Sequence, residues 1–355
     1  MEGPLRPRLA NSSDLQFGAV ATETIENALL HLAQQNEQAV KEAAGRMGSF
    51  RESRIVEFVF LLSEQWCLEK SVSYQAVEIL ERFMVKQAEN ICQQATIQPR
   101  TKTELQNWRA LKEQLFNKFI LRLVSCVQLA SKLSFHYKIV SNVTVLNFLQ
   151  ALGYMCTKEE LLESELDVLK SLNFQINLPT PLAYVEMLLE VLGYNGCSVP
   201  ATQLHATCLT LLDLVYLLHE PIYESLLRAS IENSTPSQLQ GEKFISVKED
   251  FMLLAVGIIA ASAFIQNHEC WSQVCTTEQA QYDQNLIESI PCRLRNTEDS
   301  LQKRSARTQE LDKQSRREGW KTRVGWKCLH FLYELETPKF SLSNSFIIMT
   351  PLFCF

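Results

Sequence analysis

The sequence contains few of the residues that usually interrupt regular secondary structure. Only 11 of its 355 residues are glycine and 11 are proline, and these two residue types are the strongest breakers of helices. No stretch alternates between apolar and polar residues for long enough to predict a β-strand. Hydrophobic residues make up 46% of the chain, which is typical of a protein that forms a core. We therefore expect an all-α protein, and the length favours two domains with additional tails.

The sequence motifs of common enzymes are also missing. There is no glycine-rich phosphate loop, and there is no nucleophile elbow, zinc-protease motif or kinase motif. The nearest approach to a metal site is formed by His268, Cys270 and Cys275. These residues lack the paired spacing of a four-ligand site, and ordinary packing explains them. We therefore expect no enzymatic activity, no metal, no cofactor and no small-molecule substrate.

The 11 cysteines follow no pattern that indicates disulfides, and no two of them are separated by two residues. Cys126 and Cys208 lie in apolar helical segments, where cysteine acts as a small hydrophobic residue. Free thiols are typical of a reducing compartment. The first four residues include an acid and no apolar core, so we expect no secretory signal.

Length and charge argue against a membrane or a nucleic acid as the partner. The most apolar run, at 251–265, has 15 residues, whereas a helix needs about 20 to cross a bilayer. We expect this run to be a buried core helix. The formal net charge of −6 is opposite to that of most nucleic-acid-binding domains. The segment 293–318 is rich in charges of both signs and predicts a solvated helix or linker, although it could supply local cations.

Apolar residues recur at helical spacing in five consecutive segments of the first half of the chain. We expect these helices at about 52–66, from about 73 onward, from a capping-box pattern at 101–104 to 133, at 142–151, and from a second capping-box pattern at 157–160 to just before Pro179. The part at 119–133 is apolar on nearly all sides, which is typical of a central helix. In the fifth helix we expect Leu162, Leu166 and Leu169 to point into the core.

A second set of helices is expected after Pro181. Its segments are 182–192, 202–218 and 251–265, with the last of them at the centre. A polar insert at 232–246 suggests a degenerate repeat. The predicted organisation is a flexible N-terminus at 1–24, a five-helix domain with a preceding helix at 25–178, the second repeat at 179–292, and a charged linker with an apolar C-terminal tail at 293–355.

Several segments of the first set resemble the cyclin family. They are YQAVEILERFM at 74–84, similar to the second helix of a cyclin box, LASK at 129–132, similar to the end of its third helix, and TKEELL at 157–162 with LKSLNF at 169–174, similar to its fifth helix. Their order and spacing agree with the family over about 50–185, and more weakly over 186–290. The resemblance implies a cyclin fold with one well-formed five-helix cyclin box and a degenerate second helical repeat.

Within that family, the chain resembles cyclin N-terminal-domain proteins that act in meiotic crossover formation. The resemblance implies a regulatory or scaffold protein that promotes crossovers in meiotic recombination through protein–protein binding. The implied location is the nucleus, on meiotic chromosomes. The implied partners are meiotic recombination or replication-type proteins, and a cyclin-dependent kinase is the alternative partner.

The resemblance also indicates a partner-binding site. In cyclins, the residues that match Lys132 and Glu165 hydrogen-bond to the backbone of the kinase. A lysine supplies three donors and a carboxylate supplies acceptors, so the pair can satisfy both kinds of backbone group. The apolar anchors that the resemblance adds are Leu129, Leu169, Phe174 and Ile176. Without a partner, the charged pair would be an ordinary surface salt bridge, and the two leucines would fit a core stripe equally well.

Two features depart from the pattern of kinase-activating cyclins. Leu133, Ser134 and Phe135 follow the LASK segment, where cyclins often have a bulky residue and two acids. Phe58 stands where substrate-recruiting cyclins have a tryptophan in an apolar docking patch. The sequence therefore favours a cyclin-fold scaffold, with a conventional activating subunit of a cyclin-dependent kinase as the alternative. A nucleic-acid-binding cyclin-fold factor is less favoured, because it would need a basic face.

Overall fold

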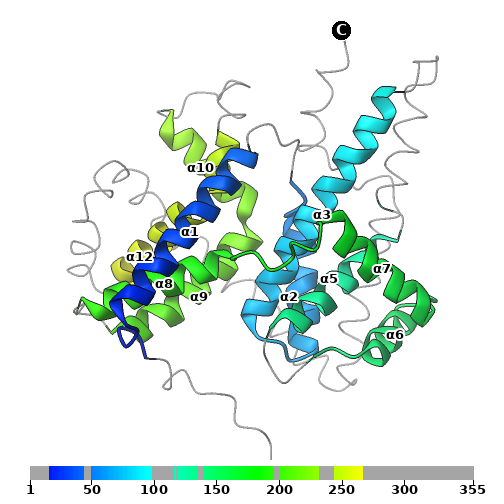
Figure 1. Ribbon diagram of the computed structural model, residues 1–355, viewed down its shortest axis with the longest axis horizontal. Coiled ribbons are helices and arrows are strands. Elements are labelled where there is room, and N and C mark those ends of the chain that lie inside the picture. Colours follow the sequence, from blue (N-terminus) through cyan, green and yellow to red (C-terminus); the bar gives the residue numbers. More distant parts are fainter. Residues whose placement is uncertain are drawn as a thin grey trace, which may run out of the picture. The chain divides into compact units, whose positions relative to one another are not determined.

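The computed structural model describes residues 16–43, 49–97, 116, 118–134, 139–195, 200–231 and 244–266. Every regular element in these residues is a helix (Figure 1), which confirms the all-α prediction. The chain divides into two compact units. We call them the five-helix unit, which holds α2, α3, α5, α6 and α7, and the α12 unit, which holds α1, α8, α9, α10 and α12.

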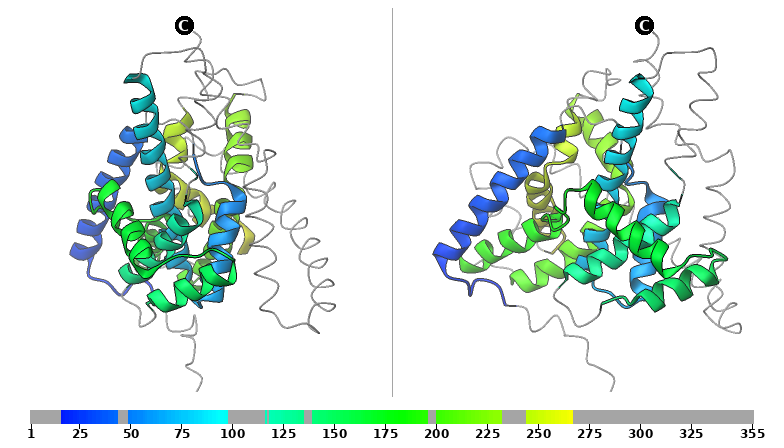
Figure 2. Two further views of the ribbon diagram at one scale, coloured as in Figure 1. Left: turned by 90° about the vertical axis from the view of Figure 1, so that its right-hand side faces the viewer. Right: turned by 45° about the vertical axis from the view of Figure 1, so that its right-hand side comes forward.

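The five-helix unit is built around one helix, as the sequence predicts. Its elements are α2 (Ser53–Gln65), α3 (Lys70–Ile97), α5 (Phe119–Leu133), α6 (Asn142–Ala151) and α7 (Lys158–Ser171). α5 packs against each of the other four (Figure 2). Twelve of its 15 residues are buried, so its nearly continuous apolar sequence is explained by neighbours on every side.

Local capping residues determine where two of these helices begin. At α7, Glu160 N donates to Thr157 Oγ1 and Thr157 N donates to Glu160 Oε2, which is the predicted capping box. At α6, Thr144 N donates to Ser141 Oγ. The other predicted capping box, at 101–104, lies outside the described residues. Local hydrogen bonds therefore explain why the beginnings of α6 and α7 were predicted correctly.

The predicted inward face of α7 is wrong. Leu162 and Leu166 are 43% and 41% exposed. The buried residues are instead Leu161, Ser164, Glu165 and Val168. This face can be buried because its two polar residues have partners on α5, and a buried polar group that is hydrogen-bonded carries little penalty.

The α12 unit consists of α1 (Thr22–Ala43), α8 (Pro181–Tyr194), α9 (Ala201–Leu217), α10 (His219–Ser230) and α12 (Phe251–Gln266). α12 packs against α8, α9 and α1, in agreement with the predicted central position. α10 was not predicted, because Pro221 suggested a break. The proline lies in the first turn of α10, where its missing N–H would have no partner within the helix.

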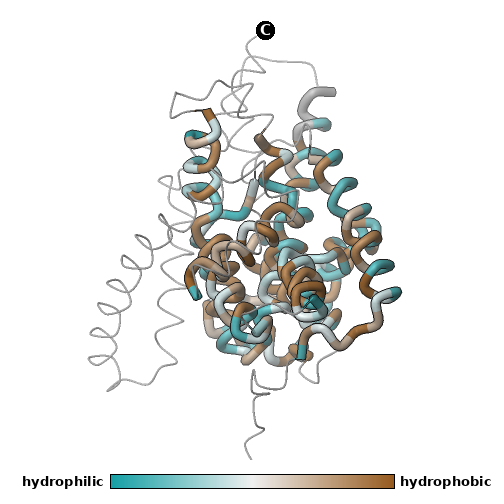
Figure 3. The backbone as a smooth tube through the Cα atoms, turned by 90° about the vertical axis from the view of Figure 1, so that its left-hand side faces the viewer, coloured by the Kyte–Doolittle hydropathy of each residue, from teal (hydrophilic) through white to brown (hydrophobic). Residues whose placement is uncertain are grey.

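α1 belongs to the α12 unit, whereas the sequence-based boundary at 25–178 grouped it with the five-helix domain. The helix packs on α8 and α12, and Tyr184 Oη donates to Leu32 O. Hydrophilic and hydrophobic residues alternate along it (Figure 3), as expected for a helix with one buried side. The preceding residues are also held, since Val20 N donates to Glu190 Oε1 at 2.8 Å. Val20 belongs to the segment 1–24 that we predicted to be flexible. The predicted tail at 293–355 lies outside the described residues.

None of the described helices alone has both the length and the hydropathy of a membrane span, although α9 and α10 reach them when counted together across a 90° bend. The most apolar helix, α12, has eight buried residues. Its interpretation as a core helix is therefore confirmed.

Asn36 of α1 closes the first turn of α12. Its Oδ1 accepts hydrogen bonds from Phe251 N and Met252 N at 2.9 and 3.2 Å. Its Nδ2 donates to Asp250 Oδ1, which also accepts from Leu253 N. Three N–H groups that α12 cannot satisfy internally are thus satisfied by two side chains. α1 is therefore an integral part of this unit.

We predict that Asn36→Ala destabilises the α12 unit by about 1–2 kcal/mol, because it leaves partly buried N–H groups at the start of α12 without a partner. Urea denaturation measures the loss, and amide hydrogen exchange at 251–254 should accelerate. Gln38→Ala is the matched control, because Gln38 is exposed on the same helix and its side chain bonds to Glu42. Unchanged exchange at 251–254 in Asn36→Ala would contradict this role.

Candidate functional site

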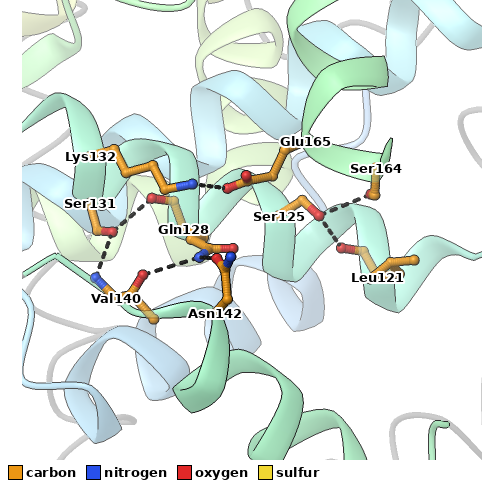
Figure 4. Close-up of polar contacts among 9 residues, drawn as sticks. All are labelled: Leu121, Ser125, Gln128, Ser131, Lys132, Val140, Asn142, Ser164 and Glu165. Carbon is orange, nitrogen blue, oxygen red and sulfur yellow. Dashed lines mark hydrogen bonds and ion pairs between the residues drawn. The ribbon is translucent and has the colours of Figure 1, made fainter. Parts of the chain in front are cut away.

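The structure brings together the two charged residues predicted to contact a partner. Lys132 lies in the last turn of α5 and Glu165 lies on α7, and the distance from Nζ to Oε1 is 2.5 Å (Figure 4). The side chain of Lys132 is 37% exposed, whereas that of Glu165 is 8% exposed. The pair therefore presents its ammonium group to solvent and keeps its carboxylate mostly covered.

A buried hydrogen bond holds α7 in this register. Ser125 Oγ lies 2.9 Å from Ser164 Oγ and 2.8 Å from Leu121 O (Figure 4). Neighbouring residues of α7, Ser164 and Glu165, thus bind residues that are about two turns apart on α5. The two contacts fix the rotation of α7 about its own axis.

A second polar cluster orients the end of α5. Gln128 Nε2 donates to Val140 O and to Asn142 Oδ1, at 3.1 and 2.6 Å. Val140 N donates to Ser131 Oγ, which in turn donates to Gln128 O. These bonds, drawn in Figure 4, tie Val140 and the first residue of α6 to the last two turns of α5. They support the backbone from which Lys132 projects.

The turn after α7 holds an aromatic ring in solvent. Asn173 and Phe174 have φ values of 51° and 62°, which is the left-handed region that residues other than glycine rarely adopt. Phe174 N donates to Leu169 O at 2.8 Å and closes the helix end. Phe174 is 65% exposed. Strained backbone of this kind concentrates at binding sites, so an exposed aromatic residue here indicates a contact surface.

Residues 175 and 176 are fixed to α3. Gln75 Nε2 donates to Ile176 O at 2.8 Å, and Arg82 Nη2 donates to Gln175 O at 2.5 Å. Ile176 itself is 8% exposed. The turn that carries Phe174 is therefore anchored on both sides, by α7 and by α3.

The four predicted apolar anchors divide into two kinds. Leu129 is 5% exposed and Ile176 is 8% exposed, so both lie in the core. Leu169 is half-buried, and Phe174 is exposed. Only the latter two reach the surface where a partner would bind.

Sequence reasoning missed Leu162 and Leu166 as surface residues of this region. The predicted contact between Glu165 and Lys132 already implied that these leucines lie at the surface. Residues of an α-helix are separated by about 100° around its axis. A helix that turns Glu165 toward Lys132 therefore places residues 162 and 166 to one side of that contact, outside the core.

The two fully enclosed cysteines of the described helices, Cys126 and Cys208, act as core residues. Burial raises the pKa of Cys126 and raises that of Cys208 to about 11, so both are protonated small core residues, as expected. No group of three His, Cys, Asp or Glu side chains in the described residues could hold a metal ion. The cluster His268, Cys270 and Cys275 lies outside them. The absence of a metal, cofactor or small-molecule substrate stays a prediction.

Comparisons with known proteins agree with the resemblance seen in the sequence. The family described as "Cyclin, N-terminal domain" matches residues 28–177. The chain is 92% identical over 275 residues to "Cyclin N-terminal domain-containing protein 1" of Mus musculus, covering 77% of this chain and 82% of that protein. It is 87% identical over 275 residues to the protein of the same name from Homo sapiens, covering 77% and 83%. No solved structure matches the chain.

We predict that Lys132→Ala destabilises the five-helix unit by about 1–3 kcal/mol, because it leaves the covered carboxylate of Glu165 without its cation. The double substitution Lys132→Ala with Glu165→Ala should lose less, because no unpaired charge is left behind. Urea denaturation of both variants measures the difference. Lys86→Ala is the control, since its partner Glu89 is 34% exposed and the loss should stay below about 1 kcal/mol. Equal losses in the single and double variants would contradict the asymmetry of the pair.

Proposed function

This chain belongs to the cyclin family, and from that premise we propose that it is a non-enzymatic scaffold which promotes crossover formation in meiotic recombination by binding other proteins. The proposed location is the nucleus, on meiotic chromosomes. The proposed partners are meiotic recombination or replication-type proteins. The resemblance to cyclin N-terminal-domain proteins of meiosis supports the pathway, and the site on α5 and α7 supports the mode of action.

The pair Lys132–Glu165, together with the exposed Phe174 on the turn after α7, is the observation that carries the proposal. Lys132 is exposed enough for its ammonium group to donate to a carbonyl of a partner, while the carboxylate of Glu165 holds the lysine in place. Charge-assisted hydrogen bonds that become covered at an interface cost about 2–5 kcal/mol to remove. Phe174 adds an aromatic anchor that is 65% exposed, and aromatic residues are enriched among the residues that dominate binding energies.

The interior of the five-helix unit supports a scaffold more than a substrate-recruiting kinase activator. Phe58 occupies the position where recruiting cyclins have a tryptophan in a docking patch. Here it is 5% exposed, and its ring centre lies 6.4 Å from that of Phe148. A side chain that is used in the core cannot form a docking patch on the surface. The five-helix unit thus offers a partner-binding surface on α5 and α7, with no aromatic patch at this position.

The alternative function is that of an activating subunit of a cyclin-dependent kinase. The observation that favours it is the Lys132–Glu165 pair itself, because the matching residues of cyclins bind a kinase. Both functions use the same side chains. Only the identity of the bound protein and the effect on kinase activity separate them.

We predict that Lys132→Ala combined with Glu165→Ala weakens binding to the physiological partner at least about tenfold, which corresponds to about 1.4 kcal/mol. The test is co-purification of the full chain with meiotic recombination proteins and, separately, with cyclin-dependent kinases. The matched control is Lys86→Ala with Glu89→Ala, which removes another ion pair from the same unit. Phe174→Ser should weaken binding without affecting the charged pair.

Each arm of this experiment discriminates between the two functions. Binding to recombination proteins that is lost in the Lys132 and Glu165 double variant, without stimulation of any kinase, supports the scaffold. Stimulated phosphotransfer by a purified kinase supports the alternative function instead. Binding that is equal in the double variant and in the control variant would refute the assignment of the site.

A further inference from the structure

A row of apolar side chains is exposed along one side of α7. Leu162 and Leu166 are 43% and 41% exposed, and Leu169 is half-buried. The spacing of four and three residues places them in one line about 10 Å long. We call these three residues the leucine ridge. Anchors at this spacing are typical of a helix that packs against a second helix.

A row of acids runs beside the leucine ridge. Glu159, Glu163 and Asp167 are all exposed and recur every four residues, and we call them the acidic ridge. Glu159 and Glu163 form no ion pair with another described residue. Asp167 interacts electrostatically with Arg122 of α5. The exposed Lys170 lies at the same angle around α7 as this row, near Asp167. The uncompensated negative charge of this surface is therefore that of Glu159 and Glu163.

The order of these features around α7 follows from the helix period. Each residue is rotated by about 100° around the helix axis from the one before it. Going around the axis from Glu165, one meets the leucine ridge and then the acidic ridge. The leucine ridge therefore lies between the Lys132–Glu165 pair and the row of acids. A helix that lies along the leucines would meet a partner-binding pair on one side and negative charge on the other.

We propose that α7 binds a basic amphipathic helix of a partner protein, with the apolar side of that helix on the leucine ridge and its lysines and arginines over the acidic ridge. This inference deepens the proposed function, because it names the chemistry of the partner at the same surface. Complementary charge selects the partner, since placing like charges together at an interface is strongly unfavourable.

Charge also argues against a second copy of this chain as the occupant. In a two-fold symmetric contact the same surface meets itself. Two antiparallel copies of α7 would then place acidic ridge near acidic ridge. Residues 303–327 of the same chain contain nine lysines and arginines and three acids. This basic segment is therefore another candidate occupant of the ridge. The experiment therefore has to separate binding within the chain from binding to a partner.

The probe is a pair of synthetic 18-residue amphipathic peptides with identical leucine stripes, one with lysine and the other with glutamate on the flanks. We expect the full chain to bind the basic peptide at least about tenfold more tightly than the acidic one, as measured by fluorescence anisotropy. Added salt should reduce the difference, because it screens exposed charges. Equal affinities for the two peptides would overturn the proposal.

Substitutions in the ridges locate the binding. Glu159→Lys with Glu163→Lys should invert the preference toward the acidic peptide, and Leu166→Ser should weaken both peptides about tenfold. The controls on α1 are Glu23→Lys with Glu26→Lys, which make the same change of charge, and Leu30→Ser, which alters a leucine that is 59% exposed. Circular dichroism checks that each variant keeps its helices. A preference that stays the same in the ridge variant overturns the proposal.

Further measurements distinguish a partner helix from the other two candidate occupants, and failure of this proposal from failure of the proposed function. Carbodiimide cross-links between residues 303–327 and the acidic ridge within a monomer would assign the surface to the chain itself and overturn the partner. A dimer in sedimentation that is lost in Leu166→Ser would assign it to a second copy, with the same consequence. Recombination-protein binding that is lost in the Lys132 and Glu165 double variant but intact in Glu159→Lys with Glu163→Lys would refute only the basic helix.

Discussion

The contact between α5 and α7 determines which side of α7 is left for other molecules. Ser164 and Glu165 face α5, where Ser125 and Lys132 satisfy them. These bonds make it acceptable to bury a partly polar face. As a consequence, two leucines of the same helix stay at the surface. The rotation of α7 about its own axis therefore determines both the charged pair and the exposed apolar row.

This rotation does not maximise the burial of apolar surface. Fully burying a leucine contributes about 1.5–3 kcal/mol relative to exposure, and α7 leaves Leu162 and Leu166 roughly 40% exposed. Phe174 adds a ring that is 65% exposed on a left-handed turn. Single exposed apolar residues are ordinary, but a contiguous row is typical of an interaction site. The core of the unit is formed without these residues, because α5 packs against four other helices.

Local patterns predicted much of the fold, and long-range contacts explain what they missed. The capping residues Ser141 and Thr157 act within four residues, so the starts of α6 and α7 could be predicted. The position of α1 could not, because Asn36 bonds to residues more than 200 positions away. The face of α7 was mispredicted because the pattern 162, 166 and 169 is more apolar than the true inner face. Lys132 and Glu165 were found only through family resemblance, since nothing local pairs residues 33 positions apart.

The charged pair alone cannot choose a partner. A lysine and a carboxylate that bind backbone groups recognise a feature that every protein has. Discrimination must therefore come from side chains around the pair, through both favourable contacts and unfavourable ones. In the proposed binding mode, Phe174 and the leucine ridge supply favourable apolar contacts, while the acidic ridge disfavours any acidic segment. Ser134 and Phe135 stand where cyclins often have two acids after the LASK segment. In the proposed binding mode, the negative charge beside the site comes from α7 instead. The proposal thus keeps the cyclin fold and changes the chemistry that selects the partner.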